Sequence, residues 1–121
     1  MIKTKLKPVL PSLREKKRYV AFEVISREKI TDADAVSGAI MDSSLRLLGQ
    51  LGVAKAGLMV LGNKWDSKLQ RGIIKVSHRH VDALKASLVF ADKIHSNEAI
   101  FRSLGVSGIL RKAEQRYMKA A

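Results

Sequence analysis

Basic side chains gather in three short segments of this sequence. Four of them lie within the run R-E-K-K-R that begins at Arg14, and others lie near residues 71–79 and 111–116. Holding so many positive charges together is unfavourable unless an anion lies nearby, so phosphate contact is the chemistry that these residues favour. A basic turn that simply faces water is the alternative for the first segment.

The same sequence gives little evidence of catalytic residues. His78 and His80 would share one face of a strand, but no carboxylate pair or cysteine accompanies them as metal ligands. A Gly-rich phosphate loop ending in G-K-[ST] is absent, and no spacing of Ser, His and Asp singles out a triad. We therefore expect no catalytic residue and no metal bound by the protein.

The charge distribution indicates what kind of partner the chain has. The 121 residues are 46% hydrophobic and 28% charged, and they carry a net charge of +12. This length suits a single domain with a real core. Residues 1–18 carry +6, residues 19–66 carry −1 and residues 67–121 carry +7. Two basic flanks around a neutral middle favour one surface for nucleic acid and another for a protein.

Three absences in the sequence bear on the expected location of the protein. The sequence contains no cysteine, and the lack of a disulfide framework fits a cytoplasmic protein. No run approaches the roughly 20 apolar residues of a membrane span. No apolar stretch follows the basic N-terminus as it would in a signal peptide. The expected location is the cytoplasm, without membrane contact.

The first elements follow from local spacing. Residues 1–10 alternate lysine with apolar residues and predict a flexible basic arm. Ser12 and Glu15 have the spacing of a capping box, which predicts a helix of one or two turns that would present the basic residues up to Arg18. Residues 19–26 predict a strand with Val20, Phe22 and Val24 on one face and Tyr19, Ala21, Glu23 and Ile25 on the other.

A long helix and an apolar strand are predicted next. The helix should start near residue 32 and stop near Gly49 or Gly52. Its inward stripe would contain Val36, Ala39, Ile40, Leu47, Leu48 and Leu51. Residues 56–63 are almost all apolar, which predicts a strand that is central in a sheet or covered by a partner.

Residues 69–80 predict a strand with two different faces. Gly72, Ile74 and Val76 would face the core, while Arg71, Ile73, Lys75 and Ser77 would face away from it. Trp65 precedes this strand in a polar loop, where a tryptophan usually covers the edge of a core, although base stacking or protein contact is an alternative.

The remaining spacing completes an α+β pattern. A helix is predicted over residues 80–94, a strand over 97–105, and a last helix from a Ser107 cap to about residue 119, with Leu110, Ala113 and Tyr117 inward. The order β-α-β-β-α-β, with an extra helix at each end, predicts a ferredoxin-like (RRM-like) antiparallel sheet. Residues 11–121 would form this single domain.

The predicted third strand lacks the aromatic residues of typical RNA-recognition domains. Arg71 and Gly72 fit the start of their signature, but Ile73 and Lys75 occupy the two stacking positions. Without these rings the sheet cannot stack unpaired bases in the usual way. Contact with phosphates, or with the shape of a folded RNA, is the expectation that remains.

Three runs of the sequence carry a family resemblance. They are P-S-L-R-E-K-K-R-Y-V-A-F-E-V-I at 11–25, R-G-I-I-K-V-S-H-R-H-V-D-A-L-K-A-S-L at 71–88 and V-S-G-I-L-R-K-A at 106–113. In order and spacing the chain resembles ribonuclease P protein component 2, the RRM-like subunit of archaeal RNase P, whose eukaryotic counterpart is shared with RNase MRP. Ile109 stands where this family usually has threonine, which weakens any role for a hydroxyl there.

The resemblance implies a role in tRNA processing within a ribonucleoprotein. RNase P removes 5′ leaders from precursor tRNA, and its catalytic centre lies in its RNA with bound magnesium. The resemblance implies that this chain binds that RNA, meets precursor tRNA indirectly, and pairs with the TIM-barrel subunit, component 3. It also implies a second copy of the chain in a two-plus-two assembly. The strand at 56–63 and the helix at 32–51 would form the protein-facing side.

The RNA-contact hypothesis names ten basic residues that would neutralise phosphates. They are Arg14, Lys16, Lys17, Arg18, Arg71, Lys75, Arg79, Arg111, Lys112 and Arg116. Two other functions remain open: a different structural RNA-binding protein, such as a ribosome-associated factor, or a small ferredoxin-like enzyme or metabolite-binding domain.

Overall fold

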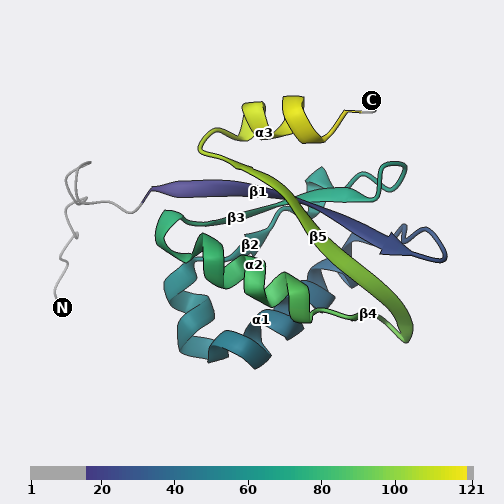
Figure 1. Cartoon of the computed structure of the whole chain (residues 1–121), viewed down its shortest axis with the longest axis horizontal. Helices are drawn as coiled ribbons and strands as arrows, with labels where there is room; N and C mark the ends of the chain where they lie inside the picture. The colour runs from purple at the N-terminus through teal and green to yellow at the C-terminus, as the bar shows by residue number, and fades with distance from the viewer. Residues whose placement is uncertain (1–15, 120–121) are drawn as a thin grey trace, which may run out of the picture.

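The computed structural model describes residues 16–119 of the chain. An antiparallel sheet carries two helices on one face and a third on the other (Figure 1). In chain order the elements are β1 (Lys17–Ser26), α1 (Ala33–Ala56), β2 (Met59–Val60), β3 (Arg71–Ser77), α2 (Val81–Phe90), β4 (Lys93–Ile94), β5 (Asn97–Ser107) and α3 (Leu110–Tyr117). The predicted arm over residues 1–10, and the predicted helix start at Ser12, lie outside the described residues.

The order of the strands confirms the predicted fold. The sheet runs β2-β3-β1-β5-β4, and all neighbouring strands are antiparallel. The four strands of the βαββαβ pattern are β1, β2, β3 and β5, with β1 and β3 at the centre, which is the ferredoxin-like arrangement. β4 is a short addition that pairs with the first residues of β5.

The main core lies between the sheet and the pair α1 and α2. From β1 it receives Val20, Phe22 and Val24, which alternate as predicted, and from β3 it receives Ile74 and Val76. The helices contribute Val36, Ile40, Leu84 and Leu88, all of them at most 1% exposed. Full burial of such side chains stabilises a fold by about 1.5–3 kcal/mol each, so this layer holds the sheet and the two helices together.

Trp65 covers the edge of this core, as expected. Its ring stacks on that of Phe22 with centroids 6.0 Å apart, and its indole Nε1 donates a hydrogen bond to the carbonyl of Ile30 at 3.3 Å. Because the ring is packed and its N–H is satisfied, Trp65 has a structural role in this fold.

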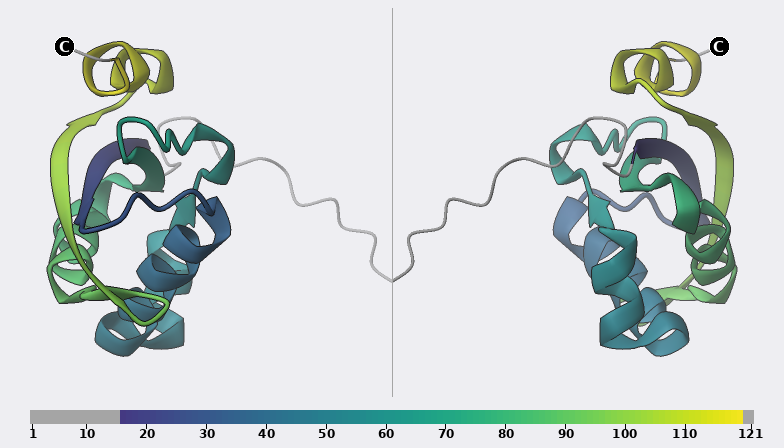
Figure 2. Two further views of the ribbon diagram at one scale, coloured as in Figure 1. Left: turned by 90° about the vertical axis from the view of Figure 1, so that its right-hand side faces the viewer. Right: turned by 90° about the vertical axis from the view of Figure 1, so that its left-hand side faces the viewer.

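The helix α3 covers part of the opposite face of the sheet. The side views show α3 alone on one side and α1 with α2 on the other (Figure 2). Ala21 and its cross-strand partner Ile73 lie on α3's face and are fully buried, as is Ala113 of α3. Ile73 does point away from the main core, as predicted, but the third helix makes that side a second, smaller apolar layer.

The helix α1 is longer than predicted. It continues to Ala56 and ends at Gly57, and it is kinked at Gly49, where φ is 75° and ψ is 171°. Only glycine adopts this backbone conformation at little cost, so the first helical stretch is interrupted at Gly49 and a second runs on to Ala56. The predicted stop at Gly49 is therefore correct for the first stretch, but helical structure continues beyond both Gly49 and Gly52.

The predicted inward stripe of α1 is only half correct. Val36 and Ile40 are buried, but Leu47 and Leu51 are 43% and 69% exposed. Leu47 lies two residues before the non-helical Gly49 and Leu51 two residues after it. The stripe that a straight helix would form is therefore interrupted at Gly49, and these two side chains face solvent.

Several boundaries also differ from the prediction. The apolar strand expected over 56–63 is reduced to Met59–Val60, and it lies at the edge of the sheet because it pairs only with β3. The helix expected to reach residue 94 ends at Phe90, because a turn at His95, with φ of 56°, folds Lys93–Ile94 back onto β5. Pairing with β1 extends β5 to Ser107, two residues beyond the predicted end.

Two predictions near the ends of the chain were wrong as well. Lys17 and Arg18 belong to β1, because they pair with Ser77 and Val76 of β3, so the predicted basic helix does not include them. Ser107 lies before α3 without capping it: its hydroxyl accepts a hydrogen bond from the N–H of Ile109, which is the N-cap residue. Within residues 16–119, no helix has the length and apolar character needed to cross a bilayer.

Candidate nucleic-acid interface

The antiparallel pairing brings three distant basic segments to one end of the sheet. Lys17 at the start of β1 pairs with Ser77 at the end of β3, and Tyr19 pairs with Ser107 at the end of β5. The residues before β1, after β3 and after β5 therefore meet at that end (Figure 1). We call this the basic end and define it by Lys16, Lys17, Arg18, Arg79, Arg111 and Lys112.

Backbone contacts tie these segments together. The N–H of His78 donates a hydrogen bond to the carbonyl of Lys16 at 2.8 Å. The guanidinium of Arg18 lies against the turn before α3, since a Cβ at Gly108 would be 3.4 Å from its Nη1. These contacts hold the start of β1 against the segments that follow β3 and β5, while Nζ of Lys17 lies beside Gly57 at the end of α1.

The charges of the basic end are not compensated by nearby carboxylates. None of its six residues forms an ion pair with another described residue. Like charges at one end of a sheet repel each other wherever they lie within the Debye length, which is about 8 Å in physiological salt. A polyanion laid across this surface would relieve the repulsion, which is the electrostatic condition for binding a phosphate backbone.

The helix α3 extends the basic surface away from that end. Arg111, Lys112 and Arg116 are exposed, whereas Ala113 is buried and Tyr117 is half-buried against the sheet. The spacing thus divides the helix as predicted, with its apolar residues on the sheet and its cations facing outward.

Arg71 lies in a different environment from the other predicted contacts. Its Nε is 3.3 Å from Oε2 of Glu23, and its Nη1 donates a hydrogen bond to the carbonyl of Tyr117 at 3.0 Å. The other carboxylate oxygen of Glu23 accepts a hydrogen bond from Nη2 of Arg102 at 2.5 Å. Arg71 is therefore held inside the protein by groups from β1 and α3.

The remaining predicted RNA-contact residues lie in different parts of the structure. Lys75 is half-buried on the α3 side of the sheet, between its cross-strand partners Tyr19 and Met59. Arg14 lies outside the described residues. The structure thus brings six of the ten predicted residues together at the basic end, with Arg116 further along α3. Sequence reasoning missed Glu23 and Gly105, whose contacts help to position α3, because those contacts are between distant segments; it placed Tyr117 on the inward side of the helix without its partners.

His78 and His80, which lie on either side of Arg79, do not form a metal site with other described residues. Nδ1 of His78 lies 3.1 Å from the carbonyl oxygen of Lys16, and Nδ1 of His80 is buried without a hydrogen-bond partner. Residues 16–119 contain no group of three or more His, Asp or Glu side chains placed to share a metal ion.

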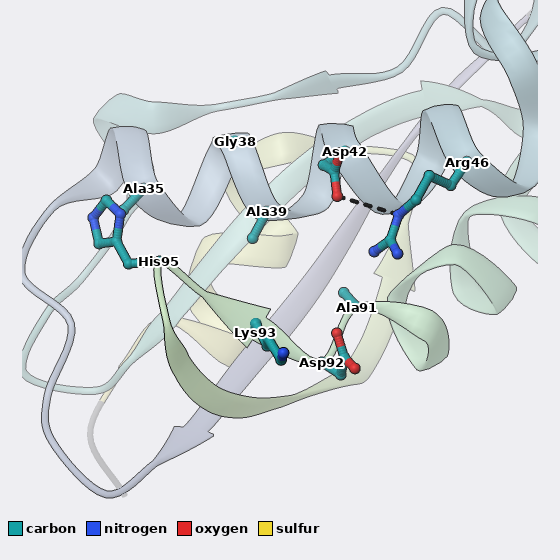
Figure 3. A pocket seen from close by; sticks show the side chains of 9 residues that line it. All are labelled: Ala35, Gly38, Ala39, Asp42, Arg46, Ala91, Asp92, Lys93 and His95. Carbon is teal, nitrogen blue, oxygen red and sulfur yellow. Dashed lines mark ion pairs between the residues drawn. The ribbon is translucent and has the colours of Figure 1, made fainter.

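A hollow of about 470 Å³ lies between α1 and the turn after α2 (Figure 3). Ala35, Gly38 and Ala39 lie along its α1 side, where Asp42 forms an exposed ion pair with Arg46 at 3.2 Å. Asp92, Lys93 and His95 lie on the opposite side. These charges are of both signs and do not converge on one point, so this hollow has no evident catalytic arrangement.

The fold and the basic end together define a class: ferredoxin-like α+β proteins with a cationic surface suited to a nucleic-acid backbone. The sequence comparison then gives the family. The chain belongs to the Rpp14/Pop5 family, whose sequence profile matches residues 18–118.

Relatives named ribonuclease P protein component 2 match nearly the whole chain. The one from Thermococcus gammatolerans is 39% identical over 97% of this chain and 95% of its own length. Those from Pyrococcus abyssi and Methanosarcina mazei are each 38% identical over 94% of both chains. These archaeal relatives confirm the resemblance seen in the three sequence runs and support the predicted function, a protein subunit of ribonuclease P.

A solved structure supports the fold independently. A chain in the cryo-EM structure of yeast ribonuclease MRP aligns with a TM-score of 0.59, over 81% of this chain and 78% of its own. At 17% sequence identity this similarity concerns the fold alone.

Proposed function

We propose that this chain is a protein subunit of ribonuclease P that binds the catalytic RNA and supports its removal of 5′ leaders from precursor tRNA. The observation that carries the proposal is the basic end, where six cations from three distant segments meet without carboxylate partners among the described residues. The family and its relatives, named as ribonuclease P components, support the choice of RNA.

The proposed mechanism is electrostatic support of a catalytic RNA. Cations of the basic end and α3 neutralise phosphates that would otherwise repel each other, so the RNA reaches its compact form at a lower magnesium concentration. The RNA and its magnesium ions perform the cleavage, and the protein supplies neither a catalytic residue nor a metal ligand. In this proposal the chain contacts precursor tRNA only indirectly, through the RNA, and the assembly acts in the cytoplasm.

The proposed protein partners dock on the nearly neutral part of the chain. We assign component 3, the TIM-barrel subunit, to the exposed leucines on either side of the Gly49 kink in α1, Leu47 and Leu51. These leucines support the assignment because the chain leaves them uncovered, and large exposed apolar side chains are typical of interaction sites. A second copy of the chain would complete a heterotetramer.

The salt dependence of RNA binding tests the basic end. Replacing Lys16, Lys17 and Arg18 together with alanine should weaken binding to RNase P RNA. It should also lower the slope of log affinity against log salt by up to about 0.7–0.9 for each phosphate that the protein no longer neutralises. Filter binding over a salt series measures both quantities.

A matched control comes from the other end of the sheet. Arg27, Lys29 and Lys93 are exposed cations near the end of β1 and on β4. Their triple alanine variant has the same change in net charge and should keep most of the slope. Equal slopes for the two variants would rule out the basic end as the RNA-binding surface.

A further inference from the structure

The helix α3 is too short to be stable without its contacts. It has 8 residues, and isolated helices shorter than about 12–15 residues are marginal in water. Its cations can therefore have fixed positions only because other parts of the chain hold the helix on the sheet. Three contacts do so, in its middle and at its C-terminal end.

The first contact joins the last turn of α3 to three strands. The Tyr117 carbonyl accepts a hydrogen bond from Nη1 of Arg71, whose Nε pairs with Glu23, and Glu23 pairs in turn with Arg102. The side chain of Glu23 is only 16% exposed, so the pairing is partly shielded from water. A guanidinium at the C-terminus of a helix also interacts favourably with the helix dipole and its free carbonyls.

The second and third contacts fix the rotation of α3. The ring of Tyr117 lies directly on Gly105 of β5, where a Cβ would overlap the tyrosine hydroxyl and ring. Glu114 forms an ion pair with Lys64 at 3.0 Å, on the loop between β2 and β3. The side chains of a helix keep fixed directions relative to its axis. A rotation of α3 would therefore turn Arg111, Lys112 and Arg116 away from their present direction.

We propose that Arg71 is a positioning residue: it holds α3 on the sheet so that the helix presents Arg111, Lys112 and Arg116 to RNA, and it does not itself contact a phosphate. This inference rests on the proposed RNA-binding function. Its structural half, that Arg71 holds α3, is measured without RNA and is separable from that function.

Arg102 provides a matched control for Arg71. Both arginines pair with Glu23, but the Arg102 side chain is 59% exposed against 28% for Arg71, and the bond to Tyr117 comes from Arg71. Arg71→Gln and Arg102→Gln therefore make the same change in charge beside the same carboxylate. Only the first releases α3.

Hydrogen exchange of the free protein measures the release. In Arg71→Gln the amides of residues 113–118 should exchange about tenfold faster or more, because a partly buried bond from a charged group is removed. In Arg102→Gln they should exchange as in the wild type. Unchanged exchange in both variants would overturn the proposal. Exchange in β1 shows whether the sheet itself stays folded.

RNA binding then separates positioning from direct contact. In the background of Arg111→Ala, Lys112→Ala and Arg116→Ala, adding Arg71→Gln should weaken RNA binding little further, because the side chains it positions are gone. A direct phosphate contact would instead produce an additive loss and lower the salt slope by about one more unit. Additive behaviour would overturn the proposal.

Two further variants keep the test decisive if Arg71→Gln folds poorly. Arg71→Lys keeps the charge but cannot reproduce the two-pronged contact with Glu23 and Tyr117, so it should weaken RNA binding nearly as much as Arg71→Gln. Gly105→Ala displaces Tyr117 without changing any charge, and it should weaken RNA binding with fast exchange in α3.

Wild-type affinity in Arg71→Lys, or in a Gly105→Ala protein with released α3, would contradict the proposal. If the α3 triple variant itself binds RNA normally, the function assigned to α3 fails instead.

Discussion

Gln70 shows how a single side chain can join two loops of this protein. It lies just before β3, and its amide accepts a hydrogen bond from the N–H of Ile30 at 2.9 Å. The same amide donates to the carbonyls of Ile30 at 2.9 Å and of Ser67 at 2.7 Å. The loop that leads into α1 is thereby fixed to the turn that starts β3.

Replacing Gln70 with alanine should lower the free energy of unfolding by about 2–4 kcal/mol, because the buried N–H of Ile30 loses its partner and the carbonyls of Ile30 and Ser67 each lose a hydrogen bond. Urea unfolding followed by circular dichroism measures this. Gln50→Ala, on the exposed side of α1, should change stability by less than about 0.5 kcal/mol. Similar small effects for both variants would show that the Gln70 bonds contribute little.

At the residue scale, the sequence predicts what local periodicity determines. The alternation Val20, Phe22, Val24 follows from the pleat of one strand and is confirmed. The partners of Gln70 include Ile30, 40 residues away, and Arg71 contacts Tyr117 across 46 residues. The periodicity of a single strand or helix carries no information about such distant pairs. Arg71 was therefore predicted to be an exposed cation.

At the scale of elements, the helix α1 differs most from its expected form. A glycine usually marks a helix end, and Gly49 and Gly52 predicted one. Gly49 does interrupt the helix, but helical structure resumes after it and ends only at Ala56, which is buried. Whether a glycine ends or bends a helix depends on what the following residues pack against, which is a property of the assembled fold.

The exposed leucines on either side of the kink in α1 lead to a prediction about the partner protein. Leu47→Gln with Leu51→Gln should weaken binding to component 3 by at least about tenfold, because the interface would be without two exposed apolar anchors. The stability of the free chain should change by less than about 1 kcal/mol, since both side chains already face water. Isothermal titration calorimetry with purified component 3 measures the affinity.

Ile100→Gln is the control for this prediction. Ile100 is also largely exposed, at 62%, but it lies on β5, on the other face of the sheet. This variant should bind component 3 normally. Loss of binding only in Ile100→Gln would move the docking surface to the sheet.

At the scale of the whole molecule, the sequence predicts two basic flanks around a nearly neutral middle, and the fold explains how the flanks come together. The basic flanks of the chain meet because β1 is antiparallel to both β3 and β5. This convergence follows from the predicted ferredoxin-like topology. The covering of the second sheet face by α3 does not follow from it, because no local pattern shows on which side a terminal helix packs.

The most direct test of the proposed function is the magnesium requirement of precursor-tRNA cleavage by RNase P RNA, reconstituted with component 3 and this chain. We predict that the wild-type chain lowers the magnesium concentration needed for half-maximal cleavage. A variant with alanine at Lys16, Lys17, Arg18, Arg79, Arg111 and Lys112 should raise it towards the value without the chain. The variant altered at Arg27, Lys29 and Lys93 should behave like the wild type. If the basic-end variant lowers the magnesium requirement as much as the wild type does, the cations at this end do not support the RNA and the proposed mechanism is wrong.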